Sequence, residues 1–289
     1  MAKESGPIQH VSDTSFWIAA YRARETERAD ALFKDPLAAL LAADRGRSIA
    51  DSMGNSATMA WTVALRTFVI DVYILEAIAR DVDTVLNLGA GLDTRPYRLD
   101  LPESLRWIEV DFPGVISYKT LRLGGEPPRC DLERIALDLS NVDERERLFG
   151  KIASRAKKVL VLTEGVVPYL ANDDVASLAA SLFAERNFQY WITDYFSKTI
   201  LTSSRRSKIR RKLGPNAPFR FDPENWEKFF AANGWKVKEM RYLVEEGLRI
   251  GRHPPSNWIM RVLYRLVPEQ KRRELEKMMG YALLERKAG

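Results

Sequence analysis

The chain of 289 residues carries a formal net charge of +6 and is 46% hydrophobic. This length and apolar content exclude disorder over most of the chain, and they suffice for one large domain or for one domain with a modest cap. The single cysteine, Cys130, excludes an intramolecular disulfide, and one cysteine with two histidines argues against a zinc site, so no metal is expected.

Two features of the sequence bear on the compartment. No run approaches 18 consecutive apolar residues, so neither a transmembrane helix nor a membrane partner is expected. Residues 1–10 lack the apolar core and the cleavage site of a secretory signal. We therefore expect a cytoplasmic protein.

Residues 13–80 are predicted to be helical. Asp13 and Thr14 are candidate caps of a first helix, and Asp35-Pro36 begins a second one because proline suits the first helical turn. A longer helix over about 58–80 places its apolar residues on one face: Trp61, Leu65, Phe68, Val69, Val72 and Leu75. We predict that residues 1–80 form a helical cap packed on the core.

From residue 81 onwards, short apolar runs alternate with helical stretches. The five runs cover residues 84–88, 106–110, 134–137, 158–162 and 190–193. This alternation predicts parallel strands joined by helices, as in a doubly wound α/β domain over residues 81–289. A helix at 226–233, a late strand at 235–243 and an amphipathic helix from Pro268 to the end complete the prediction.

The positive charge is concentrated in one segment. Residues 197–220 contain no acid and eight basic residues, which are Lys198, Arg205, Arg206, Lys208, Arg210, Arg211, Lys212 and Arg220. The segment is interpreted either as a solvated helix face or as a contact surface for an acidic partner or anionic substrate. Few aromatic residues are interleaved, so no nucleic acid partner is expected. We predict a basic lid at about 197–222 that closes over a small-molecule acceptor or docks an acidic carrier protein.

The strongest functional signal follows the first predicted strand. Residues 87–95 read Asn-Leu-Gly-Ala-Gly-Leu-Asp-Thr-Arg, and Gly89 and Gly91 allow a sharp turn and a close approach to a ligand. Asp111 lies twenty residues beyond Gly91 at the end of the second predicted strand, where its carboxylate is placed to accept both hydroxyls of a ribose. This combination indicates an adenosine-type cofactor. A tight turn with Asp93 as a helix cap is the structural alternative.

The neighbouring residues favour one cofactor over another. A dinucleotide site would want a third glycine where the chain has Thr94, and the negative charge of Asp93 would repel a pyrophosphate. S-adenosyl-L-methionine, which carries an ammonium and a sulfonium, is therefore favoured over NAD. Asp138 and Leu139 after the third strand suit an adenine, and Glu164 after the fourth suits the ammonium. Each carboxylate is alternatively an ordinary cap or loop ion pair.

An ordered series of short motifs runs along the chain, at residues 11–14, 22–25, 35–36, 66–67, 89–95, 109–111, 138–139, 163–165 and 169–170. In these motifs the chain resembles the leucine carboxyl methyltransferase family over roughly residues 11–240. The resemblance is greatest to its bacterial branch of O-methyltransferases for polyketide-type small molecules. It implies a class I methyltransferase with a doubly wound, Rossmann-like, seven-stranded sheet whose last strand is antiparallel.

The resemblance also implies a set of cofactor contacts. Arg66 would hold the cofactor carboxylate, and one of Arg22 and Arg24 would assist it. The remaining contacts follow the strand ends: Gly89, Ala90, Gly91 and Asp93 at the methionine part, Asp111 at the ribose, Asp138 and Leu139 at the adenine, and Glu164 near the amino group.

The acceptor is less well defined by the sequence. A carboxylate acceptor is ionised already, whereas a phenol benefits from a general base, and no catalytic residue is assigned. Tyr21, Tyr169, Tyr195 and His253 are candidate acceptor contacts. Two alternatives to a small natural product remain open. One is methylation of a protein C-terminal carboxylate. The other is a fold that binds the cofactor, or its product S-adenosyl-L-homocysteine, and serves a cyclisation or rearrangement without methyl transfer.

Overall fold

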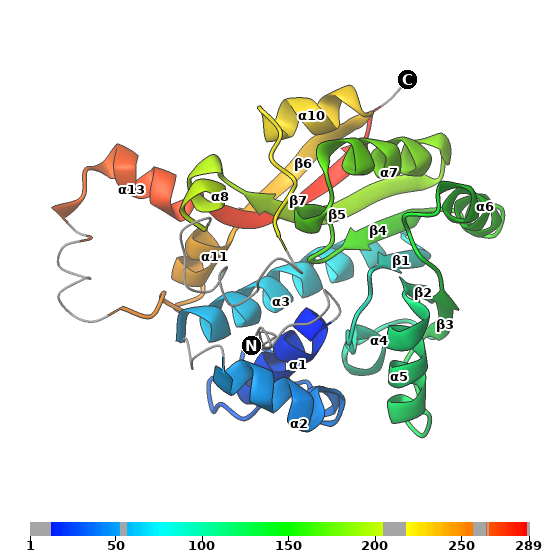
Figure 1. Ribbon diagram of the computed structural model, residues 1–289, viewed down its shortest axis with the longest axis horizontal. Coiled ribbons are helices and arrows are strands. Elements are labelled where there is room, and N and C mark those ends of the chain that lie inside the picture. The colour runs from blue at the N-terminus through cyan, green and yellow to red at the C-terminus, as the bar shows by residue number, and fades with distance from the viewer. Residues whose placement is uncertain (1–12, 53–56, 205–217, 257–263, 265, 288–289) are drawn as a thin grey trace, which may run out of the picture.

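A twisted seven-stranded sheet forms the centre of the molecule (Figure 1). The structure is a computed structural model that describes residues 13–52, 57–204, 218–256, 264 and 266–287. The strand order is β3-β2-β1-β4-β5-β7-β6, with β7 antiparallel to both of its neighbours and the first five strands parallel. The strands are β1 (Thr84–Leu88), β2 (Arg106–Asp111), β3 (Asp131–Ala136), β4 (Val159–Thr163), β5 (Phe188–Phe196), β6 (Trp235–Tyr242) and β7 (Met279–Arg286). The predicted fold class, including the antiparallel last strand, is confirmed.

Helices cover both faces of this sheet. One face packs against α6 (Val142–Ala153), α7 (Asn172–Ala184) and α10 (Trp226–Ala232). The other packs against α3 (Ala57–Ile78) and α11 (Leu243–Arg249), with α5 (Pro113–Leu123) beside β2 and β3. The remaining helices are α1 (Asp13–Thr26), α2 (Pro36–Ser52), α4 (Arg95–Arg98), η1 (Val167–Tyr169), α8 (Lys198–Ser204) and α13 (Glu269–Glu276).

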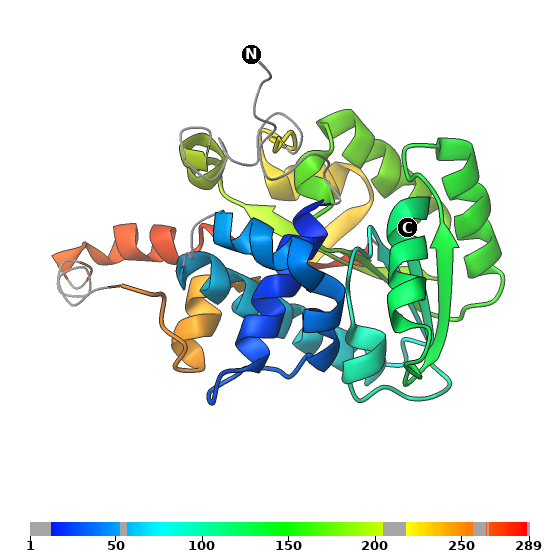
Figure 2. The ribbon, with the colours of Figure 1, turned by 60° about the horizontal axis from the view of Figure 1, so that its bottom comes forward.

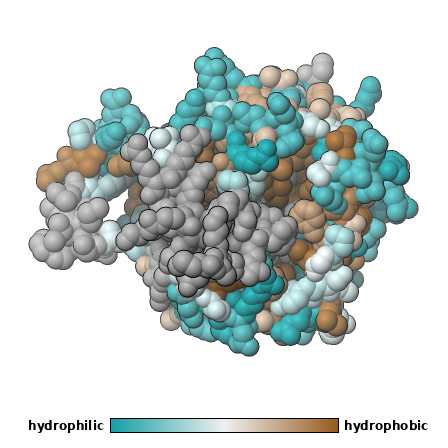
Figure 3. All heavy atoms as spheres, viewed as in Figure 1, coloured by the Kyte–Doolittle hydropathy of each residue, from teal (hydrophilic) through white to brown (hydrophobic). Residues whose placement is uncertain are grey.

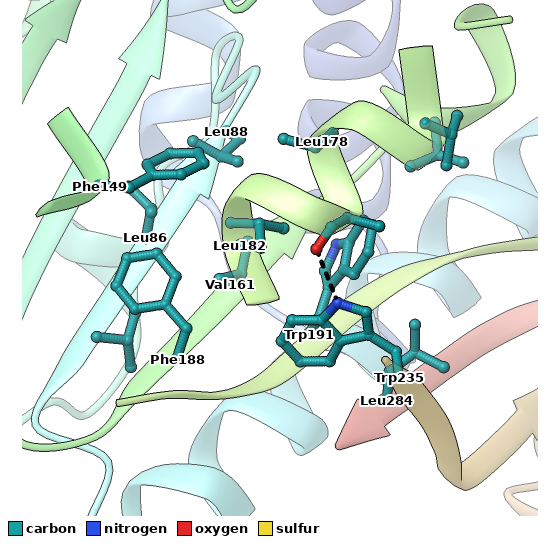
Figure 4. Packing of buried hydrophobic residues seen from close by; sticks show 14 of the residues in the cluster. Leu86, Leu88, Phe149, Val161, Leu178, Leu182, Phe188, Trp191, Trp235 and Leu284 are labelled. Carbon is teal, nitrogen blue, oxygen red and sulfur yellow. Dashed lines mark hydrogen bonds between the residues drawn. The ribbon is translucent and has the colours of Figure 1, made fainter. Parts of the chain in front are cut away.

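Alternation of side chains along the buried strands divides the core into two halves. Leu86 and Leu88 point towards α6 and α7, whereas Val85 points towards α3. In the first half, the Trp235 indole donates to the backbone carbonyl of Ala179 at 3.1 Å (Figure 4). Hydrogen bonding of such a buried indole fixes how β6 packs on α7.

The N-terminal helices build a third layer. In Figure 2, α1 and α2 lie across α3, and the three share an apolar cluster that includes Trp17, Leu41 and Val63. By length and composition alone, α3 is the one helix in the described part of the chain that is apolar enough to cross a membrane. Its buried side chains face the sheet and α1, and this position inside the fold accounts for its composition.

The prediction for the C-terminal tail is wrong in part. A helix does follow Pro268, but it ends at Glu276, and the chain then enters the sheet as β7. The third strand begins at Asp131 rather than at residue 134. The prediction missed its first residues because this edge strand alternates exposed and half-buried side chains and so lacks a continuous apolar run. Of the predicted lid, residues 198–204 form α8, and residues 205–217, which carry most of its basic side chains, lie outside the described residues.

Candidate functional site

A cavity of about 1180 Å³ opens at the edge of the sheet where the parallel strands end. Its volume lies just above the range of about 300–1,000 Å³ that is usual for small-molecule sites, so a second molecule can fit beside a cofactor. Figure 3 shows hydrophobic residues gathered in the hollow in the middle of this face. The nine predicted cofactor contacts all line the cavity: Arg66, Gly89, Ala90, Gly91, Asp93, Asp111, Asp138, Leu139 and Glu164.

The glycine loop folds tightly over the end of β1. Gly89 and Gly91 have φ angles of +67° and +48°, which glycine adopts without strain. A Cβ atom on Gly89 would lie 2.4 Å from Cγ2 of Val166, so the backbone can pass there only as glycine. The amide nitrogens of Gly89 and Ala90 donate to the carbonyl of Val110 at 2.8 and 3.1 Å, which fixes the loop against β2.

Asp111 faces the same loop from the end of β2. Its Oδ2 accepts from the amide of Gly91 at 2.7 Å, and its Oδ1 accepts from the amide of Phe112 at 2.7 Å. A carboxylate offers about four acceptor positions, so it can accept from several donors at once. The half-buried Asp111 is therefore oriented towards the cavity as an acceptor for hydroxyl groups.

The far end of the cavity, beyond β3, carries the residues expected to frame an adenine. Asp138 is exposed and accepts from the Ser140 amide at 2.9 Å, whereas Leu139 is half-buried. The buried Arg145 of α6 donates to the Leu139 carbonyl at 2.9 Å and to two serine hydroxyls of α7. Arg145 thereby holds the turn that presents Asp138 and Leu139, a role that sequence analysis missed.

The opposite end of the cavity, where β4 ends, is called the near end, and it contains an ion network. Oε1 of Glu164 accepts from Nε of Arg66 at 2.7 Å, and its Oε2 accepts from Nη1 of Arg95 at 2.7 Å. Burial alone would raise the pKa of Glu164, but the two guanidinium groups lower it to about 2. Glu164 is therefore an anion at neutral pH. Arg66 and Glu164 together present one positive and one negative group to the same part of the cavity.

Asp93 is bound differently from the prediction. Its carboxylate accepts from the Arg95 backbone amide, from Nη1 of Arg95 and from the Asn87 amide, each at 2.9 Å. Burial by itself would raise the pKa of Asp93, yet Arg95 holds that pKa well below its ordinary range. Asp93 does line the cavity, but Arg95 offsets its charge. Repulsion of a pyrophosphate by an unpaired Asp93, the argument drawn from the sequence, is therefore wrong.

The structure decides between the two arginines of α1. Arg22 is buried, lines the cavity and pairs with Asp35 at 3.0 Å. Arg24 lies nearer the surface and pairs with Asp51. Of the two, Arg22 is the one that can assist Arg66.

Only one of the four predicted acceptor contacts, Tyr169, lines the cavity, and burial raises its pKa to about 12. Tyr21 is buried in the apolar cluster of the N-terminal helices. Tyr195 points to the opposite face of the sheet, where its ring packs against Trp226 and Tyr242. His253 is exposed in the loop after α11. Tyr21, Tyr195 and His253 therefore do not line the cavity, and in the case of Tyr195 the reason is that a position near a strand end does not fix the direction of a side chain.

Two residues at the near end were not predicted from the sequence. Tyr281 of β7 lines the cavity, and its hydroxyl donates to Oδ1 of Asp194, a buried acid in β5, at 2.9 Å. Asp194 directly follows the predicted run 190–193, but Tyr281 lies in a tail predicted as helix. Only the pairing of β5 with β7 brings the two residues together.

The sequence was compared with those of known protein families. A model of the leucine carboxyl methyltransferase family matches residues 15–183, more than half of the chain. The chain belongs to this family. The family predicted from the sequence is thus confirmed.

Relatives of similar length support this assignment. A protein of Mycobacteroides abscessus is 28% identical over 277 residues, covering 84% of this chain and 89% of the relative. A protein of Streptomyces avermitilis is 31% identical over 248 residues, covering 78% and 82%. Both bear the name "Putative S-adenosyl-L-methionine-dependent methyltransferase", which contains the cofactor expected from the sequence.

Solved structures share the fold. The crystal structure of a DUF574 family protein from Streptomyces avermitilis superposes with a TM-score of 0.59 at 14% identity, over 93% of this chain and 97% of that chain. A structure named as a putative methyltransferase from Thermobifida fusca gives a TM-score of 0.55 at 16% identity, over 86% and 92%. At these identities the likeness establishes the fold alone.

Proposed function

We propose that this protein is an S-adenosyl-L-methionine-dependent O-methyltransferase that methylates a carboxylate or an acidic hydroxyl of a small, polyketide-type natural product. The product of the cofactor would be S-adenosyl-L-homocysteine. One observation carries the proposal: a carboxylate suited to a ribose, Asp111, and an arginine–glutamate pair, Arg66 with Glu164, face one cavity with the glycine loop between them.

The residues present fit this cofactor. Gly89 and Gly91 line the cavity with bare backbone, and a side chain has little space at either position, since a Cβ would lie 2.4 Å from Cγ2 of Val166 at Gly89 and 3.1 Å from the Ser15 side chain at Gly91. The amino-acid end of the cofactor is a zwitterion, and Arg66 and Glu164 offer one group of each opposite charge. When bound, S-adenosyl-L-methionine supplies a methyl group on an activated leaving group.

Each part of the cofactor would then have its own contacts along the cavity. The residues that would hold it are Arg66 at the carboxylate, Glu164 at the amino group, Gly89, Ala90, Gly91 and Asp93 along the methionine part, Asp111 at the ribose, and Asp138 with Leu139 at the adenine. Arg22 would add a second positive group near the carboxylate.

Beyond the arginine–glutamate pair, the cavity becomes apolar, which supports a small apolar acceptor. Its walls there include Ile18, Met59, Phe196, Ile200, Phe219 and Met279. Because the leaving group is activated, the protein's main contribution is to hold the acceptor oxygen in line with the methyl group. Apolar walls suit this task, since they bury the acceptor skeleton and leave its oxygen at the polar junction near Tyr169.

Methyl transfer is tested by incubating the purified protein with S-adenosyl-L-methionine and a panel of aromatic hydroxyl and carboxylic compounds. We expect S-adenosyl-L-homocysteine to accumulate above the acceptor-free background together with a methyl ether or ester. If the protein binds the cofactor but converts an acceptor without consuming it, the alternative of a cyclisation or rearrangement enzyme replaces this proposal.

A further inference from the structure

Two buried side chains at the near end of the cavity form a hydrogen-bonded pair that cofactor binding does not require. Asp194 and Tyr281 are directly opposite in the register of β5 and β7, so both side chains project from the same face of the sheet. The Tyr281 hydroxyl donates to Oδ1 of Asp194 at 2.9 Å. Tyr281 lines the cavity, whereas Asp194 lies behind it.

Asp194 occupies a setting that disfavours a buried anion. Oδ2 accepts from the Gly165 amide at 2.9 Å, but within the described part of the chain no lysine or arginine forms an ion pair with this carboxylate. The charged and titratable groups that face it are Arg66 from α3, Glu164 after β4, Tyr169 from η1 and Tyr281 from β7. Arg66 gives its hydrogen bonds to Glu164 instead.

These surroundings tune the carboxyl towards proton exchange. Burial raises the pKa of Asp194 to about 6, against the opposing effect of Arg66 and the hydrogen bonds from Gly165 and Tyr281. A carboxyl with such a pKa is ionised at neutral pH yet takes up a proton readily. A purely structural acceptor for Gly165 and Tyr281 would need no ionisable group at this position.

We propose that Tyr281 and Asp194 form a proton relay for the acceptor, and that the acceptor is therefore a hydroxyl compound, a phenol or an enol, rather than a carboxylic acid. This inference rests on the proposed function. The O–H bond of the acceptor breaks, and its proton passes to Oη of Tyr281 while the proton of Tyr281 passes to Oδ1 of Asp194. The acceptor oxygen keeps the electron pair and becomes the nucleophile. Asp194 ends neutral, so the negative charge moves from Asp194 to the acceptor oxygen and the total charge does not change.

The apolar walls agree with a hydroxyl acceptor. A carboxylate would lose its hydration among Phe196, Phe219 and Met279, and the positive charge nearest to them in the sequence is that of Arg220, which also lines the cavity. A neutral phenol enters such a chamber at lower cost and is ionised only where Tyr281 receives its proton.

The relay can be tested with two acceptors of different acidity, phenol and p-nitrophenol, in methyl transfer from S-adenosyl-L-methionine at a pH one unit above the pKa of p-nitrophenol. At this pH about nine tenths of p-nitrophenol is ionised, whereas phenol, with a pKa of about 10, is still neutral. We expect Tyr281→Phe to lower kcat for phenol by about 100-fold or more and to leave kcat for p-nitrophenol within about twofold of wild type, because only the neutral acceptor has to lose a proton. Asp194→Asn should show the same selective loss.

Tyr73→Phe is the matched control. Tyr73 is fully buried and its hydroxyl donates to the backbone carbonyl of Tyr281 at 3.2 Å, but it does not line the cavity. This variant should methylate both acceptors as the wild type does. If Asp194→Asn does not fold, the comparison of Tyr281→Phe with Tyr73→Phe still decides the matter.

Three outcomes overturn the relay: a wild type that methylates p-nitrophenol but not phenol, equal kcat for phenol in wild type and Tyr281→Phe, or an equal loss for both acceptors in Tyr281→Phe. Calorimetry with S-adenosyl-L-homocysteine separates these failures from failure of the proposed function. A protein that binds the homocysteine product and methylates p-nitrophenol alone lacks only the relay. A protein that does not bind the product contradicts the proposed function itself.

Discussion

Arg95 donates from Nη1 to Oε2 of Glu164 at 2.7 Å, and this bond joins the segment after β1 to the segment after β4 beneath the cavity. Arg95 also contacts Asp71 at 2.7 Å and Asp93 at 2.9 Å, and its side chain is almost completely buried. One guanidinium thus contacts three carboxylates. The geometry of the near end of the cavity depends on it.

Replacing Arg95 should destabilise the fold strongly. Arg95→Met leaves the buried Asp71 and Asp93 and the half-buried Glu164 with less positive charge, and breaking a buried ion pair costs about 3–5 kcal/mol. We expect a loss of this size in the free energy of unfolding in urea. Arg47→Met, which removes an exposed pair with Asp44, should change it by less than about 1 kcal/mol. Equal effects of the two changes would show that the network contributes little.

A methyl group on the glycine loop should distort the cofactor site. Gly89→Ala places a Cβ atom 2.4 Å from Val166 Cγ2 at a φ of +67°, and the backbone strain alone costs about 1–2 kcal/mol. Thermal unfolding should therefore occur at lower temperature and S-adenosyl-L-homocysteine should bind more weakly. Adding Val166→Ala should recover part of the loss. Gly114→Ala, where a Cβ meets nothing within 4 Å, is the control and should match the wild type.

The ionised state of Glu164 should appear in the acid stability of the protein. Its pKa falls from an ordinary 4.5 to about 2 in the folded protein, so the anion stabilises the fold fully above pH 4.5. That contribution, roughly 3 kcal/mol for a shift of this size, is lost as the pH falls from 4.5 towards 2. In Glu164→Gln, the free energy of unfolding measured in urea should therefore fall less steeply over this pH range than in the wild type. The exposed Glu224→Gln should leave the decline unchanged, and an unchanged decline in Glu164→Gln would contradict the assignment.

The first five strands and the glycine loop could be predicted because their sequence signals are local. Each central strand is a short apolar run, and Gly89, Gly91 and Asp111 follow such runs directly. The cavity edge then follows from topology, since parallel strands bring their carboxyl ends to one side of the sheet.

The remaining part of the site depends on contacts between distant residues. No local pattern pairs Arg95 with Asp71 across 24 positions, or with Glu164 across 69 positions. The position of Tyr281 in a strand could not be predicted for another reason. Only Lys277 and Met278 separate the charged helix 269–276 from β7, and the combined stretch resembles one amphipathic helix. Pairing with β5 and β6, rather than its own sequence, makes β7 a strand.

The account's central claim is that the cavity at the carboxyl edge of the sheet holds the adenosine part of the cofactor through Asp111. Isothermal titration with S-adenosyl-L-homocysteine tests it on wild type, Asp111→Asn and Asp111→Ala, with Asp131→Ala at the exposed start of β3 as the control. We predict that the wild type and the control bind alike, and that both Asp111 variants bind at least about tenfold more weakly, because a charged hydrogen-bond partner is worth about 1.5–3 kcal/mol. Wild-type protein that does not bind, or Asp111 variants that bind as tightly as wild type, would contradict the claim.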